Sequence, residues 1–298
     1  MTPKIHTIDL HFKNKSQTIA AFLIETDGGL VLVESGPDST YPQLQKGIED
    51  LGFLPSQVRW VLLTHIHFDH AGAAWRLARL GAKIAVHPKG YKHLQDPEKL
   101  YKSAKRIYGD QMETLWGQMK PIDEKQLHET HHNEKIMVGN TTFTAHHTPG
   151  HASHHIAWQL NSQKTIFTGD VAGIKISRGI VVPPCPPPDL DIEQWLESID
   201  LLLSLKPDVF YLTHYGKVTA IVEHCSQLKK MLIDRKNWIK PYVDANKTIE
   251  EITPLFIEYI NNELKEHNVS LLNFKRYEAA NPAFMSVEGL IRYWQTKQ

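Results

Sequence analysis

Four side chains that can bind a metal ion lie within six consecutive positions: His65, His67, Asp69 and His70. They follow an apolar run, residues 58–63, that is typical of a buried strand, and α/β proteins often build their sites where strands end. Since residues i and i+2 of an extended chain point the same way, His65 and His67 can share one ion. Asp69 and His70 are adjacent, and the Ala-Gly pair at 71–72 allows a turn that directs them to a second ion. Four such groups without a partner at the end of a buried strand would be energetically costly.

Three further candidate ligands follow other apolar runs. His151 closes the sequence HTPGH, Asp170 closes FTGD, and His214 follows the predicted strand at 208–212. Each is weak evidence alone, because a single histidine at a strand end is more often bonded to backbone than to a metal. Four segments that together carry five histidines and two aspartates are strong evidence for a metal site.

The motifs T-H-x-H-x-D-H, H-T-P-G-H and T-G-D, followed by a strand-end histidine, resemble the metallo-β-lactamase-fold hydrolase superfamily over about residues 17–216. The resemblance implies an α/β fold, a four-layer αββα sandwich with the site at one edge of its two sheets. It also implies two metal positions with a shared carboxylate. The implied ligands are His65, His67 and His151 at the first position, Asp69, His70 and His214 at the second, and Asp170 as the bridge.

Imidazole and carboxylate ligands together suit Zn²⁺, and also Fe or Mn. Two ions that hold one water would lower its pKa towards neutrality, and the resulting hydroxide attacks a carbonyl or phosphoryl centre. Asp69 could take up the proton of the nucleophile while it remains a ligand. We therefore predict a hydrolase with two divalent ions, Zn²⁺ first, that cleaves an ester, lactone, thioester or phosphoester. The alternatives are a persulfide dioxygenase with a single iron and a non-catalytic scaffold that kept the metal site.

The motifs also favour one branch of the superfamily. True β-lactamases of this fold have Cys at the position of Asp170 and are secreted. Residues 1–16 show no apolar stretch of the kind that a secretory signal needs, so we expect a protein that is not secreted. Lactonases share T-H-x-H-x-D-H-A-G and H-T-P-G-H, and glyoxalase II shares a helical C-terminal extension. The resemblance is therefore to the lactonase and glyoxalase II branch.

Three other residues have two interpretations each. Glu34 stands where the superfamily more often has Asp, and it either orients a metal ligand from behind or is an ordinary strand-end carboxylate. Tyr215 follows His214 directly, and its phenol either donates to a substrate oxygen or packs. Cys185 either lines the mouth of a pocket or is structural. His146, His147, His154 and His155 flank the ligand segments and are candidates for supporting contacts.

The elements that must position these residues alternate between strand and helix in the first third of the chain. Apolar runs at 17–25 and 30–34 predict two strands around the turn Asp-Gly-Gly at 27–29. A helix at 41–51, the strand at 58–63, a helix at 73–80 and a strand at 83–86 follow. Residues 88–121 change character, because apolar residues recur at helical spacing from 100 to 119. This predicts a helical insert that packs on the core or acts as a lid or dimer surface.

The second half returns to strands before it becomes helical. Strands are predicted between 134 and 168, then a stiff proline-rich segment at 183–188, a helix at 191–205 and the strand at 208–212. Thr248 and Glu251 form a predicted capping box for a helix to about 265, and helices should break near Pro241 and Pro282. We thus predict a catalytic domain at 1–216 and a helical C-terminal extension at 217–298.

Composition limits the partners. Lys plus Arg and Asp plus Glu both number 33, and this balance disfavours a dedicated nucleic-acid binder. Two cysteines exclude a disulfide framework and fit a reducing compartment. No apolar run is long enough to cross a membrane. We expect a cytoplasmic protein with a small-molecule substrate, no nucleic acid, no membrane contact and possible homodimers. Of the 18 histidines, five belong to the predicted site and thirteen have no chemical explanation.

Overall fold

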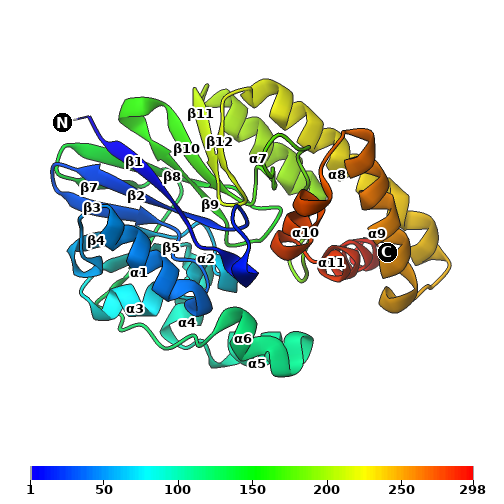
Figure 1. Cartoon of the computed structure of the whole chain (residues 1–298), viewed down its shortest axis with the longest axis horizontal. Helices are drawn as coiled ribbons and strands as arrows, with labels where there is room; N and C mark the ends of the chain where they lie inside the picture. The colour runs from blue at the N-terminus through cyan, green and yellow to red at the C-terminus, as the bar shows by residue number, and fades with distance from the viewer. Residues whose placement is uncertain (1, 298) are drawn as a thin grey trace.

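The computed structural model describes residues 2–297, and two six-stranded sheets form its centre (Figure 1). The first sheet runs in the order β1 (Lys4–Asp9), β2 (Ala20–Thr26), β3 (Gly29–Val33), β4 (Val58–Leu62), β5 (Lys83–Val86) and β6 (Leu127–Glu129). The second runs in the order β12 (Gly216–Val218), β11 (Val209–Leu212), β10 (Thr165–Gly169), β9 (Ile156–Leu160), β8 (Thr141–His147) and β7 (Lys135–Val138). Both sheets are mixed: β3 to β6 are parallel in the first, and β10 and β11 are the parallel pair of the second.

The α-helices have the following bounds: α1 (Tyr41–Asp50), α2 (Phe68–Ala71), α3 (Ala74–Arg79), α4 (Pro88–Gln95), α5 (Glu98–Tyr108), α6 (Met112–Trp116), α7 (Ile192–Ser204), α8 (Ile221–Asp244), α9 (Ile249–Glu266), α10 (Leu271–Ala280) and α11 (Ala283–Gln295). Among the described residues, no helix is both long enough and apolar enough to span a lipid bilayer.

The C-terminal helices form the predicted helical extension, with two corrections. Residues 216–218 form the short strand β12, which pairs with β11, so the helical part begins only at Ile221. Pro241 does not break α8, which continues to Asp244. A proline lacks the backbone N–H, so one intrahelical hydrogen bond is missing in the last turns of this helix. Pro282 does separate α10 from α11. The predicted capping box of Thr248 and Glu251 opens α9.

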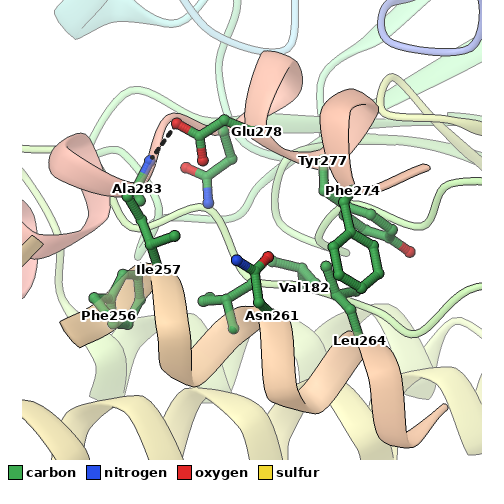
Figure 2. Close-up of a pocket in the computed structure, with 11 residues that line it drawn as sticks. Val182, Phe256, Ile257, Asn261, Leu264, Phe274, Tyr277, Glu278 and Ala283 are labelled. Carbon is green, nitrogen blue, oxygen red and sulfur yellow. Dashed lines mark hydrogen bonds between the residues drawn. The ribbon is translucent and has the colours of Figure 1, made fainter. Parts of the chain in front are cut away.

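A small cavity of about 40 Å³ lies between α9, α10 and the segment before the prolines (Figure 2). Its volume is room for about one water molecule. Beside it, the Tyr277 hydroxyl donates to Ile180 O at 2.6 Å and accepts from Ile176 N at 3.1 Å. The extension therefore fixes the loop that leads into the proline-rich segment.

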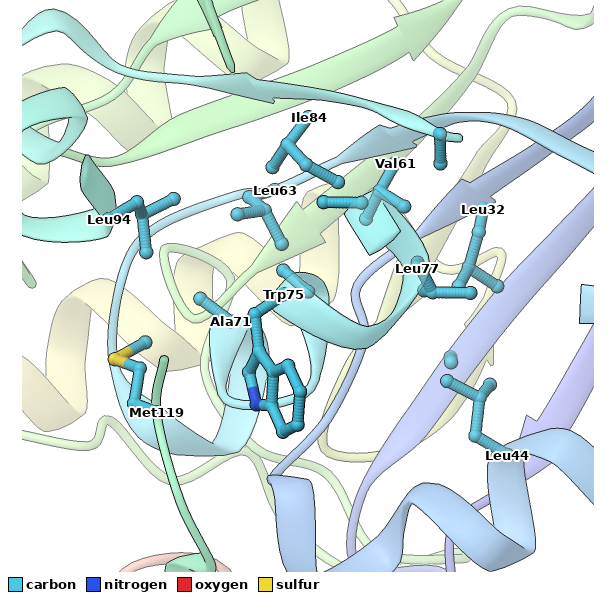
Figure 3. Packing of buried hydrophobic residues seen from close by; sticks show 14 of the residues in the cluster. Leu32, Leu44, Val61, Leu63, Ala71, Trp75, Leu77, Ile84, Leu94 and Met119 are labelled. Carbon is cyan, nitrogen blue, oxygen red and sulfur yellow. The ribbon is translucent and has the colours of Figure 1, made fainter. Parts of the chain in front are cut away.

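Three buried clusters define four layers, as the resemblance implied. The inner faces of the two sheets meet in one cluster, in which Phe22 and Val33 lie opposite Phe143 and Trp158. The outer face of the first sheet is covered by helices from α1 to α6 (Figure 3). The outer face of the second sheet is covered by α7, α8, α9 and α11. The predicted αββα sandwich is confirmed.

The insert at 88–121 contains three helices, α4, α5 and α6. The apolar stripe at 100–119 predicts helical structure but not its interruption: α5 stops at Tyr108, and α6 begins at Met112. Gly109 has φ +53°, which ends the helical backbone there. The turn brings Trp116 back against Phe12, with ring centroids 5.2 Å apart, so the insert packs on the core.

The short edge strands β1 and β6 also escaped prediction. β6 has only three residues, too few to show an alternation. β1 has only one buried residue, Ile8, so it lacks the apolar pattern of the central strands.

Candidate metal centre

All seven predicted ligands lie at one edge of the two sheets, where strands end. His65 and His67 follow β4, and Asp69 and His70 lie in the single turn of α2. The other three come from the second sheet: His151 follows β8, Asp170 follows β10 and His214 follows β11. The four segments approach one another because the two sheets pack face to face.

Backbone hydrogen bonds join the two sheets at this edge. Ile156 N donates to Thr64 O at 2.7 Å, and Ala20 N donates to Thr213 O at 2.9 Å. Each acceptor precedes a histidine of the site, so these bonds fix the segments of His65 and His214 across the sandwich.

The first group of ligand atoms comprises three imidazole nitrogens. His65 Nε2 lies 2.8 Å and His151 Nε2 lies 3.2 Å from His67 Nδ1. These atoms, one from each ring, lie within 4.8 Å of one another, and their side chains are largely buried. The structure therefore brings together the three residues that the resemblance implied for the first position.

The second group comprises one carboxylate and two imidazoles. Asp69 Oδ2 lies 3.5 Å from His70 Nε2 and 3.4 Å from His214 Nε2. A third combination, His65, His70 and Asp170, connects this group to the first. Two neighbouring positions could thus hold a metal ion.

Asp170 lies between the two groups and presents one oxygen to each. Its Oδ2 lies 3.3 Å from His151 Nε2, in the first group. Its Oδ1 lies 3.4 Å from both His70 Nε2 and His214 Nε2, in the second. This arrangement suits a carboxylate that bridges two cations.

The atoms of the second group also test whether a cation fits. His70 Nε2, His214 Nε2 and Asp170 Oδ1 are buried and lack a hydrogen-bond partner. Three unpartnered polar atoms in one buried spot are unfavourable, and a cation that binds all three removes that cost. Imidazole and carboxylate are also the donors that Zn²⁺, Fe and Mn accept, so the residues fit a divalent ion.

Glu34 lies directly behind this group and is fully buried. Its Oε1 accepts hydrogen bonds from His70 Nδ1 at 2.8 Å, from Thr64 Oγ1 at 2.6 Å and from Thr213 Oγ1 at 3.0 Å. A proton on His70 Nδ1 leaves Nε2 with its lone pair directed at the site. Of the two interpretations of Glu34, the geometry supports the one in which it orients a ligand.

Other histidines of the site are oriented in the same way. His65 Nδ1 donates to Thr64 Oγ1 at 3.0 Å, and that hydroxyl in turn donates to Glu34. The Nδ1 atoms of His151 and His214 donate to Pro184 O at 2.9 Å and to Thr18 O at 2.7 Å. Each bond leaves Nε2 free to bind a cation.

The sequence analysis did not identify the groups that orient the histidines: the hydroxyls of Thr64 and Thr213 and the carbonyls of Thr18 and Pro184. The threonines immediately precede His65 and His214, so the pattern Thr-His at a strand end carried a usable signal. The carbonyls carried none, because any residue has one. Of the four flanking histidines, His155 supports the site, since its Nε2 accepts from Asp170 N at 3.2 Å.

Burial and neighbouring imidazoles keep the first group neutral. Burial, then His70 and His67, hold the pKa of His65 well below its usual value. Burial and His151 lower the pKa of His67 to about 3. A neutral imidazole is the form that binds a metal.

In the second group, neighbouring carboxylates outweigh burial and raise the pKa values of the histidines. Burial lowers the pKa of His70, but Asp69 and Glu34 outweigh it and raise that pKa well above its usual value. Burial opposes the ionised form of Asp170, yet His70 and His214 hold its pKa well below its usual range. The negative charge of this group attracts protons or a cation.

The structure places Tyr215 away from the reacting position. Its ring packs among the buried clusters, and burial and Asp9 raise the pKa of its hydroxyl. The cavity beside the site is instead lined by Tyr108 from the insert, whose pKa burial and then Asp69 raise. The position of Tyr215 fits its interpretation as a packing residue, and Tyr108 is the phenol next to the site.

Cys185 is fully buried, which raises the pKa of its thiol to about 12. This burial fits its interpretation as a structural residue.

The chain belongs to the metallo-β-lactamase superfamily. The family profile "Metallo-beta-lactamase superfamily" matches residues 17–214. A protein of Sulfurisphaera tokodaii, "Metallo-beta-lactamase fold-containing protein ST1585", is 32% identical over 234 residues, which cover 76% of this chain and 86% of that protein. A protein of Aspergillus fumigatus named "Atrochrysone carboxyl ACP thioesterase" is 26% identical over 180 residues, 60% of this chain and 44% of that protein.

Solved structures share the fold. The crystal structure of ST1585 superposes with a TM-score of 0.62 at 28% identity and covers 75% of this chain and 85% of that one. The crystal structure of a metallo-β-lactamase family protein from Thermus thermophilus, TTHA1429, has a TM-score of 0.73 at 20% identity. It covers 99% of this chain and 93% of that one, so the likeness extends over the C-terminal helices.

Proposed function

We propose that the protein is a hydrolase that holds two divalent metal ions, Zn²⁺ first, and cleaves a carboxylic ester, lactone or thioester. The observation that carries the proposal is Asp170, which offers one carboxylate oxygen to each of two adjacent groups of ligand atoms. His65, His67 and His151 would hold one ion, and Asp69, His70 and His214 the other.

The two ions, when bound, would supply a water nucleophile at neutral pH and a Lewis acid for the scissile carbonyl. The protein holds the ligands in place through Glu34, Thr18 O and Pro184 O, so no reorganisation is needed as charge develops. Asp69 has a carboxylate oxygen at the edge of the cavity and would accept the proton that the nucleophile loses. Tyr108, which lines the same cavity, would donate a hydrogen bond to a substrate oxygen.

Relatives support hydrolysis as the reaction class. The Aspergillus relative is named a thioesterase, and a Bacillus subtilis protein that is 26% identical over 155 residues is named "Probable metallo-hydrolase YybB". The walls of the cavity carry few cations, so esters and thioesters of carboxylic acids suit it better than polyanionic phosphoesters.

The rival reactions make different demands on the ligands. A dioxygenase with a single iron uses one group of ligands and leaves the other group of inward-facing atoms without a partner. A non-catalytic scaffold has no chemical need for all seven side chains.

Metal analysis tests the proposal. We expect about two divalent ions per purified chain, and Asp170→Asn should lose both metal and hydrolysis of an ester, lactone and thioester panel. Asp189→Asn is the matched control for metal content, because Asp189 lines the same cavity and bonds to Ser153 but belongs to none of the groups of ligand atoms. One iron per chain, with oxygen consumed on a glutathione persulfide, would overturn the proposal.

A further inference from the structure

A cavity of about 390 Å³ opens directly onto the candidate metal centre. Four of the ligand side chains form one end of it: His67, Asp69, His151 and Asp170. The volume falls within the range of small-molecule sites, about 300–1,000 Å³. Whatever reacts at the metal centre must place the rest of its structure in this cavity.

The walls of this cavity are apolar and come from three distant segments of the chain. The helices α5 and α6 of the insert form one side, the proline-rich segment forms another, and the junction of α10 and α11 forms the third. Representative wall residues are Leu100, Ala104, Ile107, Trp116, Pro187 and Met285. The insert and the C-terminal extension thus meet over the metal centre.

Apart from the ligands, this lining contains two side chains that carry a full charge, the exposed Lys99 and the partly buried Asp189. The same lining includes His93. Asp189 accepts a hydrogen bond from the hydroxyl of Ser153, so its carboxylate is already engaged. The rest of the wall therefore offers mainly apolar contact to a bound molecule.

We propose that this cavity binds the apolar acyl chain of an ester or thioester and so places its carbonyl at the metal centre. The inference rests on the proposed function and specifies its substrate class. In the reaction water adds to the acyl carbon, the bond to oxygen or sulfur breaks, and the alcohol or thiol leaves with a proton. The products are a carboxylate, the alcohol or thiol, and one proton released to solvent.

Binding in an apolar cavity should depend on the length of the acyl chain. Each buried methylene strengthens binding about fourfold, until the chain outgrows the cavity. A substrate that makes only polar contacts at the metal centre would show no such dependence. The affinity of the product carboxylates measures this dependence on chain length without any turnover.

The experiment uses the zinc-loaded full chain and the sodium salts of acetate, hexanoate and decanoate. Calorimetry should show affinity rising from acetate to hexanoate to decanoate, and kcat/KM for the matching acyl thioesters should rise in the same order. A flat profile in both measurements overturns the inference.

Two isoleucines provide a matched pair of variants. Ile107 lies on α5 in the cavity wall and is 41% exposed, and Ile233 lies on α8 outside that wall and is 44% exposed. Ile107→Asp should weaken decanoate binding about five- to tenfold and leave acetate unchanged, because a hydrated carboxylate replaces apolar wall. Ile233→Asp should change neither. Equal losses in both variants overturn the inference.

Ala104→Trp blocks the interior directly, since Ala104 is 7% exposed on the inner face of α5. It should abolish the advantage of decanoate over hexanoate, with circular dichroism to check folding. The two proposals fail separately. Length-dependent carboxylate binding without any hydrolysis overturns the proposed function alone, whereas hydrolysis that ignores chain length overturns only the acyl cavity.

Discussion

Oε1 of Glu34 lies 2.8 Å from Nδ1 of His70, and both side chains are fully buried. The same oxygen accepts from Thr64 and Thr213, so one carboxylate joins His70 to the residues that precede His65 and His214, at the edges of the two sheets. Glu34 has φ +67°, a backbone conformation that few side chains adopt, and this directs the longer glutamate into the site.

Glu34→Gln should weaken metal binding at the second group about 10- to 100-fold. The amide keeps the size of the side chain, but its neutral oxygen is a weaker acceptor for His70, and its NH2 group would face Thr64 N, which donates to Oε2 of Glu34 at 3.3 Å. Competition with a chelator measures the affinity. Glu134→Gln is the control, because Glu134 makes a similar contact to His128 at 2.6 Å on another part of the surface. Unchanged metal affinity in Glu34→Gln would refute the orienting role.

Metal affinity should rise with pH. Burial lowers the pKa values of His70 and His214, but Asp69 and Asp170 outweigh it and raise both. A metal ion must displace any proton on these rings, and each displaced proton weakens apparent binding about tenfold per pH unit below its pKa. Isothermal titrations at pH 6, 7 and 8 should thus show progressively tighter binding. An affinity independent of pH contradicts this.

Tyr108→Phe should lower kcat/KM for an ester substrate about three- to tenfold, the worth of one hydrogen bond. Tyr215→Phe should leave it near the wild-type value, because the Tyr215 hydroxyl faces Asp9 and not the cavity. Metal content should stay unchanged in both variants, which separates a role towards substrate from a role in the metal site. The reverse order of effects would restore the interpretation of Tyr215 as a catalytic group.

Gly289→Ala should reduce stability by about 1–3 kcal/mol through overpacking. A Cβ at this position would lie 2.0 Å from Cys185 O, so α11 and the proline-rich segment must separate. The adjacent Pro184 O orients His151, and metal affinity should therefore fall as well. Thermal unfolding with and without chelator reports both effects. Arg292→Ala, on the exposed side of the same helix, should be neutral.

Local patterns in the sequence were enough to predict most central strands and helices and to pick out the seven candidate ligands, whereas the assignment of those ligands to two metal positions came from the family resemblance. Alternation and apolar runs report burial over four or more residues, and strand ends mark where polar side chains converge. The edge strands β1 and β6 were not predicted, because each buries only one residue and so shows no pattern. The break at Gly109 was not predicted, because the spacing of apolar residues does not show where a helix is interrupted.

The sequence by itself determined four side chains of the candidate metal centre, since His65, His67, Asp69 and His70 are held together by chain connectivity and short-range geometry. Only the tertiary structure decided which groups surround it. The sequence had indicated Glu34 but left its role open, and it gave no sign of Tyr108. Both reach the site because sheet packing and the folded insert bring together residues that are far apart along the chain. The apolar cavity likewise exists only where the insert meets the C-terminal helices, and no local pattern encodes such a long-range contact.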